Sequence, residues 1–323
     1  MTVSSAAILA QGIVKRFGKI VALNGLNIEV QSRELFGLLG PNGAGKTTTI
    51  NILSGLARPD QGKIVVAGID CTRRPRQAQH LIGIVPDENN LYPELTGLAN
   101  LCFCAALYGI PKQERIDRAE RLLADFGLKE AAHRRFGEYS KGMKRKLTIA
   151  AGIIHQPPIL FLDEPTTGID VQSARHIRQL IVELHRAGIT ILLTTHYIEE
   201  AQRLCDRIGF IVAGRIVRTD TVTNLLAPIQ SSEVLELTVA DRVVDAVTLF
   251  TRKITGVQFT IIDEHRIRAE SEHRVPIGLL ADILEAEGIV LQEVRRSQPT
   301  LEEVFIQTTG LEADALRREK EKK

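Results

Sequence analysis

The residues with the clearest chemical potential form the loop GPNGAGKTT at positions 40–48. The loop fits the pattern G-x-x-x-x-G-K-[ST], in which successive backbone N–H groups surround a polyphosphate. In that pattern the lysine, here Lys46, reaches the β- and γ-phosphates, and the hydroxyl of Thr47 ligates Mg²⁺. The sequence therefore predicts a nucleotide site built from Gly40, Pro41, Asn42, Gly43, Ala44, Gly45, Lys46, Thr47 and Thr48. The loop alone is equally compatible with a kinase, a GTPase or a helicase.

Two adjacent carboxylates, Asp163 and Glu164, follow the apolar residues 159–162. At the end of a buried strand, Asp163 would lie beside Mg²⁺ bound at Thr47, and Glu164 would accept a proton from a water that attacks the γ-phosphate. His196 follows another apolar run, and we expect it to donate a hydrogen bond near the γ-phosphate. A solvated turn and a structural histidine are the alternatives, which the phosphate loop disfavours. The predicted catalytic residues are Glu164, His196 and Lys46.

A second candidate anion site begins at Ser140, where YSKGMKRKL at positions 139–147 opens a helix. The Ser140 hydroxyl, the Gly142 N–H and the helix N-terminus are groups that bind phosphate. One nucleotide needs one such site, so two sites predict two chains that meet head to tail, each completing the other's nucleotide site. Asp170, after a tight turn at Gly168, is placed to bridge that interface. The alternative is a helix cap followed by a basic, solvated helix face.

These side chains need a framework to position them. Residues 35–39 form an apolar strand before the phosphate loop, and a helix begins after the loop. Apolar runs flanked by helical patterns predict buried, largely parallel strands. Strands are expected at 62–68, 81–85, 159–162, 190–194 and 208–212, and helices at 98–108, 113–126 and 141–155. The fold class is therefore α/β, a layered P-loop NTPase domain over residues 6–225 with a helical insert at about 91–145.

The pattern changes near Pro228, where a second domain is expected over residues 231–310. Residues 234–239 are expected to be a strand, 242–251 a helix, 257–269 a hairpin, 277–286 a helix and 289–294 a strand. The order βαββαβ predicts a small α+β domain of the ferredoxin-like kind. A helix at about 301–308 and a charged tail, residues 311–323, complete the chain.

Composition narrows the class of protein. The formal net charge is +2 and only 4% of residues are aromatic, which argues against a nucleic-acid partner. No apolar run is long enough to span a bilayer, and the N-terminus lacks the basic start and apolar core of a leader. We therefore expect a soluble or peripheral protein. The cysteines show no metal or disulfide spacing and are expected to be reduced: Cys71, Cys102, Cys104 and Cys205.

Over residues 6–225 these motifs, in this order, resemble those of the ATP-binding subunit of an ABC transporter. The resemblance implies ATP and Mg²⁺ as ligands, with Thr47, Asp163 and Asp87 at the metal. It implies that residues 140–143 are the signature motif, that Asp170 belongs to the D-loop and that Phe17 stacks on adenine. It also implies a homodimer, or a pair with a similar ATPase, at the cytoplasmic face of the membrane, bound peripherally to separate transmembrane permease subunits.

The chain departs from the family pattern in two motifs, at Asp87 and in the signature motif, which reads YSKGM where LSGGQ is commoner. Asp87 stands where the family usually has a glutamine that contacts Mg²⁺ and the attacking water. Lys141 replaces a glycine in the signature motif and adds a cation beside the phosphate, so the second site comprises Ser140, Lys141 and Gly142. This signature, together with TTHYIEEA at 194–201 and LEEVF at 301–305, resembles the exporter branch that moves drugs, antibiotics, polysaccharides or lipids.

The resulting hypothesis is an ATP-hydrolysing motor subunit that drives export. The alternatives are an importer motor and a soluble ABC-type ATPase that acts on ribosomes or DNA. The chain lacks the second phosphate loop that is usual in ribosome-acting relatives. The spacing of its motifs also leaves no room for the long coiled coil of DNA-repair relatives. The permease is expected to bind residues 91–126, with candidate exposed side chains Leu91, Tyr92, Phe103 and Tyr108. The sequence leaves open the transported substrate and the role of the C-terminal domain.

Overall fold

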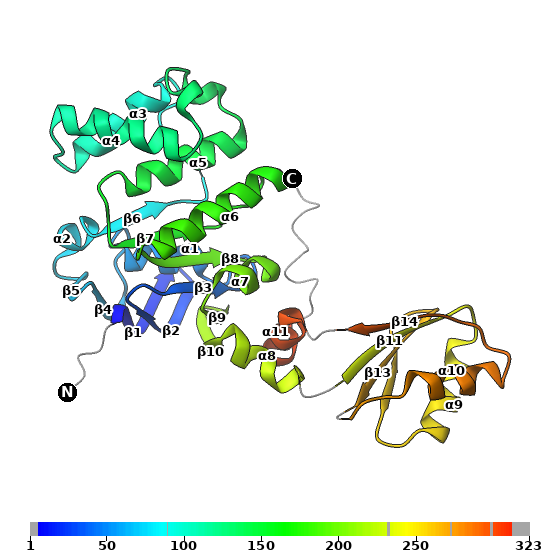
Figure 1. Ribbon diagram of the computed structural model, residues 1–323. Coiled ribbons are helices and arrows are strands. Elements are labelled where there is room, and N and C mark those ends of the chain that lie inside the picture. The colour runs from blue at the N-terminus through cyan, green and yellow to red at the C-terminus, as the bar shows by residue number, and fades with distance from the viewer. Residues whose placement is uncertain (1–5, 89, 231–232, 272, 298–299, 312–323) are drawn as a thin grey trace. The chain divides into compact units, whose positions relative to one another are not determined.

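The computed structural model describes residues 6–88, 90–230, 233–271, 273–297 and 300–311. The chain divides into two compact units, residues 1–221 with 308–323, and residues 222–307 (Figure 1). Each unit is treated separately below. Of the charged tail at 311–323, only Leu311 lies within the described residues.

A six-stranded sheet in the order β10-β9-β3-β8-β7-β6 forms the centre of the larger unit. Its strands are β3 (Leu35–Leu39), β6 (Ile82–Val85), β7 (Ile159–Asp163), β8 (Thr190–Thr195), β9 (Arg207–Val212) and β10 (Arg215–Thr221). All neighbours are parallel except β9 and β10. Every residue of β3, β7 and β8 is buried, which explains their continuous apolar sequences. Their carboxyl ends meet at one edge, where the predicted chemical groups follow.

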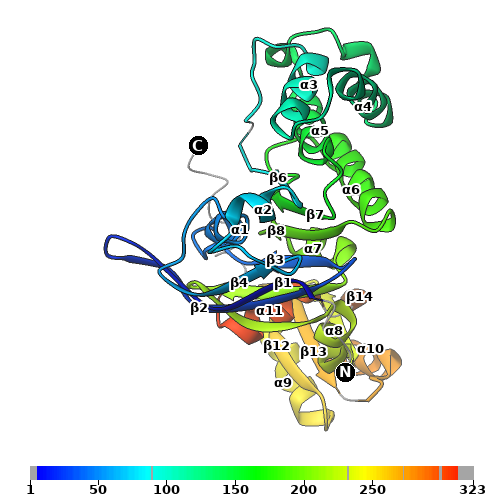
Figure 2. The same ribbon diagram turned by 90° about the vertical axis from the view of Figure 1, so that its left-hand side faces the viewer.

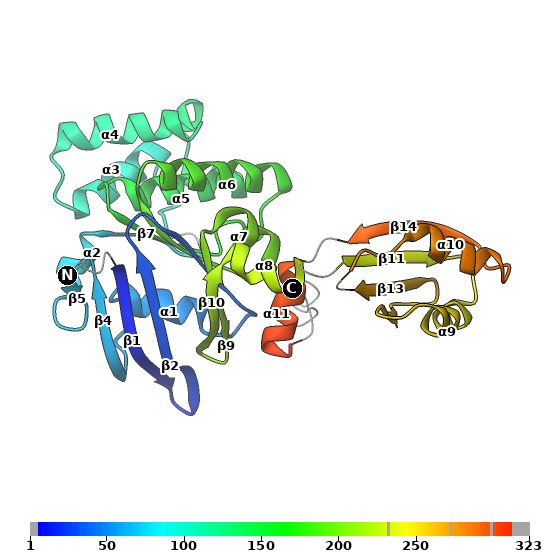
Figure 3. The same cartoon turned by 60° about the horizontal axis from the view of Figure 1, so that its bottom comes forward.

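A second sheet, in the order β2-β1-β4-β5, is antiparallel throughout. It comprises β1 (Ala6–Phe17), β2 (Ile20–Gln31), β4 (Gln61–Val66) and β5 (Ile69–Asp70). Figure 3 shows β1 and β2 as a long hairpin with β4 beside β1. Apolar residues from this sheet, from the parallel sheet and from α1 (Lys46–Leu53) share one core, exemplified by Leu26, Phe36 and Ile52. That core fixes the helix that follows the phosphate loop against both sheets.

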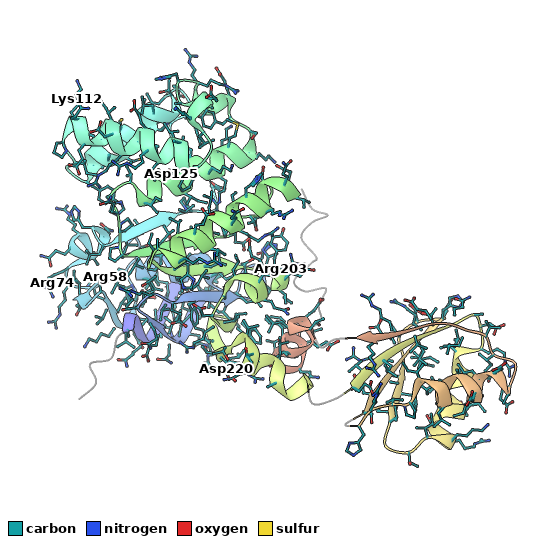
Figure 4. The ribbon with its side chains drawn as sticks, viewed as in Figure 1. Arg58, Arg74, Lys112, Asp125, Arg203 and Asp220 are labelled. Atoms are coloured by element: carbon teal, nitrogen blue, oxygen red, sulfur yellow. The ribbon has the colours of Figure 1, made fainter. Side chains whose placement is uncertain are left out.

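Helices cover the parallel sheet and build the insert. They are α2 (Pro75–Gln79), α3 (Gly97–Leu107), α4 (Lys112–Asp125), α5 (Lys141–Ile153), α6 (Val171–Arg186) and α7 (Ile198–Leu204), with short 3₁₀ turns at Lys129–Ala131 and Phe136–Glu138. Figures 1 and 2 place α3 and α4 in a layer apart from the sheets, with α5 and α6 between. Figure 4 shows the side chains of that layer, with Lys112 and Asp125 marking the two ends of α4. The strands and helices predicted from the sequence are present within a few residues of their expected bounds.

Several elements were not predicted. Helix α6 could have been predicted from the sequence, because its buried residues Ala174, Ile177 and Ile181 recur at helical spacing after the N-cap Asp170. Helix α7 and strand β10 were also missed, as was α8 (Val222–Gln230), which continues through Pro228 where a change of pattern was expected. The cysteines are free thiols, in agreement with the expectation from their spacing.

The smaller unit contains a four-stranded antiparallel sheet in the order β12-β13-β11-β14. Its elements include β11 (Glu233–Val239), α9 (Val243–Lys253), β12 (Gln258–Ile261), β13 (Arg266–Ser271), α10 (Ile277–Glu285) and β14 (Leu291–Ser297). Helix α11 (Leu301–Thr309) follows β14 and extends past Gln307, the last residue of this unit. Leu235, Phe250 and Leu280, from one strand and two helices, are fully buried in its core. The βαββαβ order and this strand order are those of the predicted ferredoxin-like fold.

One histidine makes the stability of the larger unit depend on pH. The His155 ring stacks on Tyr108 at 3.6 Å between centroids, and its Nε2 lies 3.2 Å from the carbonyl oxygen of Ile82. Burial, with smaller contributions from the charges of His80 and Arg118, lowers the pKa of His155 from 6.5 to about 4. As the pH falls through this window, the unfolded chain binds a proton that the folded chain does not bind, so stability decreases.

We therefore expect the free energy of unfolding to fall from pH 6.5 to 4 by an amount on the order of 1 kcal/mol more in the parent than in His155→Gln. Urea unfolding at stepped pH measures this difference. The exposed His133→Gln serves as the matched control and should follow the parent. Equal pH slopes for the parent and His155→Gln would contradict the assignment.

Candidate active site

The phosphate loop joins β3 to α1 with a backbone that requires glycine. Gly43 and Gly45 have φ angles of 76° and 106°, in the left-handed region that disfavours other residues. A Cβ atom on Gly45 would also lie 2.7 Å from the carbonyl oxygen of Ala22 on β2. The loop therefore passes too close to the β1–β2 sheet for any side chain at this position. Helix α1 begins at the next residue, and no side chain caps its N-terminus, which is suited to an anion.

Lys46 lies inside this loop and is only 5% exposed. Its Nζ donates hydrogen bonds to the carbonyl oxygens of Gly40 at 2.9 Å and Pro41 at 3.1 Å, and to Asn42 Oδ1 at 3.4 Å. It also lies 3.1 Å from Glu164 Oε1. The loop thus encircles an ammonium group, which balances the buried charge of the carboxylate.

Asp163 ends β7 and is 2% exposed. Its Oδ1 accepts a hydrogen bond from the hydroxyl of Thr194 on the neighbouring strand β8. Its main-chain oxygen accepts a hydrogen bond from Arg145 Nη2 at 2.6 Å. The carboxylate is therefore held at the sheet edge by the adjacent strand, as a metal-binding group requires.

Glu164 has a φ of 45°, a strained conformation for a residue with a side chain. Its Oε2 accepts a hydrogen bond from Thr167 Oγ1 at 3.0 Å and lies 2.8 Å from His196 Nδ1, although that nitrogen lacks the alignment of a hydrogen bond. Burial of Glu164 opposes ionisation, but His196 and the positive charge of Lys46 outweigh it and lower the pKa of Glu164 to about 2. The carboxylate is thus ionised and held between the ammonium group of Lys46 and the ring of His196.

These groups face a cavity of about 490 Å³. The described residues that line it are Ile20, Val21, Ala22, Asn42, Gly43, Gly45, Lys46, Thr47, Thr48, Asp87, Glu164, Thr167 and His196. The sheet therefore brings together the phosphate loop and all three predicted catalytic residues. Thr47, Asp87 and Asp163 also line one adjoining groove of about 690 Å³.

Asp87 lies two residues after β6 and lines both the cavity and the adjoining groove. The residue is solvent-exposed, yet partial burial of its carboxyl group and the negative charge of Glu164 raise its pKa above the usual range. Its main-chain oxygen accepts a hydrogen bond from Arg145 Nη1 at 3.2 Å. Asp87, at the position where the family usually has glutamine, therefore lies on the side of the site where Mg²⁺ and the attacking water are predicted to bind.

The donor set suits Mg²⁺ shared with phosphate. In the part of the chain that the structure describes, no group of three or more His, Cys, Asp or Glu side chains is arranged to hold a metal by itself. Mg²⁺ usually binds through one or two protein carboxylates, a hydroxyl, waters and substrate phosphates rather than an all-protein cage. Thr47, Asp163 and Asp87 supply hard oxygen donors of that kind beside the phosphate loop.

The second predicted anion site is not part of this cavity. Ser140 is exposed, and its Oγ caps α5 by accepting a hydrogen bond from the N–H of Met143 at 3.2 Å. Lys141 beside it is also exposed. A Cβ atom on Gly142 would lie 2.2 Å from Ser173 Oγ on α6, so close packing of the two helices requires this glycine. The N-terminus of α5 is therefore exposed at Ser140 and Lys141, and neither residue lines its own chain's cavity.

Asp170 and Phe17 also lie outside the cavity lining. Asp170 caps α6 by accepting a hydrogen bond from the N–H of Ser173 at 2.8 Å, and this contact holds the pKa of Asp170 below its usual range. Phe17 ends β1 with 54% of its surface exposed, and the Nζ of Lys15 lies 5.2 Å from its ring centre. Ile20, on the other side of the same hairpin turn, lines the cavity and is 70% exposed.

Some residues of the site were not predicted from the sequence. Thr167 and Thr194 bind the two carboxylates, and their hydroxyls were not distinguished from ordinary turn and strand residues. Arg145 was not predicted as a site residue, and the basic, solvated helix face offered as the alternative for this segment does not describe it, because it is buried. Ile20 and Val21 were not predicted to line the site. Thr194 stands two residues before His196 in the sequence, and this position was the one feature that could have marked it as a site residue.

Of the four side chains on the insert that were expected to be exposed, two are exposed. Tyr92 and Phe103 are 50% and 39% exposed and pack edge to face at 5.1 Å. Leu91 is wrong, because it is buried at 8% exposure, and Tyr108 is only partly exposed since it stacks on His155. Leu107, which was not predicted, is 68% exposed.

Comparison with known proteins gives matches over most of the chain. A family model described as ABC transporter matches residues 23–167. The chain is 38% identical over 305 residues to the linearmycin resistance ATP-binding protein LnrL of Bacillus subtilis, which covers 93% of this chain and 97% of the relative. It is 36% identical over 308 residues to the Nod factor export ATP-binding protein I of Burkholderia lata, which covers 94% and 96% respectively.

The fold is also similar to a solved dimeric ATP-binding cassette in a post-hydrolysis state with ADP and phosphate bound. That match has a TM-score of 0.62 and 27% identity, and it covers 67% of this chain and 98% of that one. The buried lysine, the paired carboxylates and the histidine described above therefore lie in a fold of the same kind as that of this ATP-binding cassette. The chain is thus a member of the ABC transporter family, an ATP-binding subunit with ATPase activity.

Proposed function

We propose that this chain is the motor subunit of an exporter. Two copies close head to tail on two ATP molecules with Mg²⁺, hydrolysis reopens them, and the movement is passed to separate transmembrane subunits. The observation that carries the proposal is the separation of the two anion sites. Ser140 and the N-terminus of α5 lie exposed, outside the cavity that contains Lys46 and Glu164. A second copy is therefore needed to place both sites on one nucleotide.

The resting contacts suggest how nucleotide binding prepares the site. Lys46 is shared between the loop carbonyls and Glu164, and the phosphates of ATP offer it stronger acceptors. Movement of the ammonium towards phosphate takes the positive charge of Lys46 away from Glu164 and so raises the basicity of that carboxylate. Glu164 then accepts the proton of the attacking water while His196 donates towards the γ-phosphate. Thr47, Asp163 and Asp87 would hold Mg²⁺, which would supply neutralisation of the charge on the phosphates.

Adenine binding is proposed for the β1–β2 hairpin. Phe17 offers an exposed ring, and Ile20 and Val21 line the apolar side of the cavity next to the phosphate loop. An exposed aromatic ring is suited to stacking on a base, because every base has a π-face. Ser140, Lys141, Gly142 and Asp170 are proposed to complete the site from the second copy.

Export and the membrane partner are inferred from the relatives and from the insert. One relative is named for linearmycin resistance and another for Nod factor export. No helix among the described residues combines the length and the apolar content needed to cross a bilayer. Tyr92, Phe103 and Leu107 present exposed apolar surface, which is suited to a permease subunit. We propose a peripheral position on the cytoplasmic face of the membrane.

The base assignment is tested by Glu164→Gln. This variant should bind ATP, lose hydrolysis by about a hundredfold or more, and accumulate as an ATP-bound dimer in size-exclusion chromatography. Glu199→Gln, which makes the same chemical change at a side chain 86% exposed, is the matched control and should hydrolyse ATP at the parent rate. Hydrolysis by Glu164→Gln near the parent rate would remove Glu164 from the role of base.

The departure at position 87 is tested by Asp87→Gln, which restores the usual family residue. We expect nucleotide affinity to stay within about twofold, because the P-loop contacts of the phosphates are unchanged, and turnover to change by several-fold or more. Filter binding and steady-state ATPase assays with the membrane subunits present separate these quantities. The adjacent Glu88→Gln is the control. An unchanged rate in Asp87→Gln would exclude this side chain from the mechanism.

A further inference from the structure

One buried arginine joins the helix of the second anion site to the catalytic edge of the sheet. Arg145 lies on α5, five residues after Ser140, and is 5% exposed. Its Nε donates to the carbonyl oxygen of Pro165 at 2.9 Å, and Nη2 donates to that of Asp163 at 2.6 Å. Its Nη1 donates to the carbonyl oxygens of Asp87, at 3.2 Å, and Pro86. A single planar guanidinium thus binds both loops that carry the predicted carboxylates.

The partners of Arg145 are main-chain oxygens rather than carboxylates. None of the ion pairs found in the described part of the chain includes it. Burial lowers the pKa of Arg145, whereas the nearby charges of Asp87 and Asp163 oppose that shift. A guanidinium remains charged under these conditions and has five donors in a fixed fork. The geometry is therefore suited to holding peptide groups in place.

The segment held in this way contains the strained residue of the site. Glu164, with its φ of 45°, stands between Asp163 and Pro165, whose carbonyl oxygens both bind Arg145. On the other side of the turn, Thr166 Oγ1 donates to the buried Glu200 Oε1 at 2.6 Å. A strained backbone persists only where its surroundings over-determine it. Arg145 supplies that restraint from α5, and Glu200 supplies it from α7.

We propose that Arg145 is a positioning residue for hydrolysis. It holds the strained turn of Glu164 and the loop of Asp87 in fixed register with the N-terminus of α5. Docking of a second copy's nucleotide at Ser140 is thereby transmitted to the carboxylates of the same chain, through one rigid side chain. The catalytic consequence depends on the proposed motor function, whereas the restraint of the two loops does not.

The test compares Arg145→Lys and Arg145→Gln with Arg118→Lys. Lysine keeps the charge but has one nitrogen, which cannot reach carbonyls of two loops at once. Arg118 is the matched control, because its Nη1 also donates to a main-chain oxygen of the same helical region, Ile154 at 3.1 Å, with no contact to either loop. Hydrogen–deuterium exchange is measured over residues 85–88 and 163–167, and ATPase kinetics are measured well below the melting temperature of each variant.

We expect amides of both loops to exchange about tenfold faster or more in Arg145→Lys and Arg145→Gln, and at the parent rate in Arg118→Lys. The kcat should fall by about tenfold or more, with KM for ATP within about twofold, because misplacement of the carboxylates leaves the phosphate loop intact. Combination with Glu164→Gln should add little further loss of rate, since Arg145 acts through that residue.

Unchanged exchange in both loops would overturn the proposal, even if the rate fell. So would an unchanged kcat in a folded variant, or a failure of both Arg145 variants to fold at any temperature, which would assign the residue a structural role only. A parent protein without ATPase activity would instead contradict the proposed function, and the exchange measurement would still decide whether Arg145 restrains the loops.

Discussion

The contact between Lys46, Glu164 and His196 is the interaction on which the site depends. The three residues follow β3, β7 and β8, which are adjacent and parallel, so their carboxyl ends necessarily meet at one edge of the sheet. The buried ammonium and carboxylate neutralise each other in the resting state, and each would be costly to bury alone. A phosphate that competes for the ammonium therefore changes the charge balance of the whole edge.

Around this contact, the molecule restrains main-chain segments rather than individual side chains. The strained turn at Glu164 is bound by Thr194 on β8, whose main-chain oxygen accepts from the Glu164 N–H at 3.1 Å, and by the guanidinium of Arg145. The close approach of Gly142 to Ser173 joins α5 to α6, and α6 begins at the capping Asp170. The open N-terminus of α5 is thus mechanically connected to both carboxylate loops.

Much of this arrangement is predictable from the sequence, because local patterns determine it. The run GPNGAGKTT, the apolar strands before Asp163 and His196, and the βαββαβ order each follow from periodicity and turn residues. Burial across the fold is less predictable. Arg145 is one of four basic residues within six positions, which is typical of a solvated face, and only the packing of α5 against the sheet edge reveals its contacts. Leu91 was misassigned for the same reason, since exposure on the insert depends on which helices pack together.

The central claim, that each nucleotide site is completed by a second copy, is tested most directly by mixing two inactive variants. Lys46→Ala removes the phosphate-loop cation, and Ser140→Asp keeps a helix cap but repels phosphate. In a head-to-tail dimer, the mixed pair contains one intact site. We therefore predict that each variant alone is inactive and that an equal mixture recovers about a quarter of the parent ATPase rate. A mixture that remains as inactive as its components would contradict the claim.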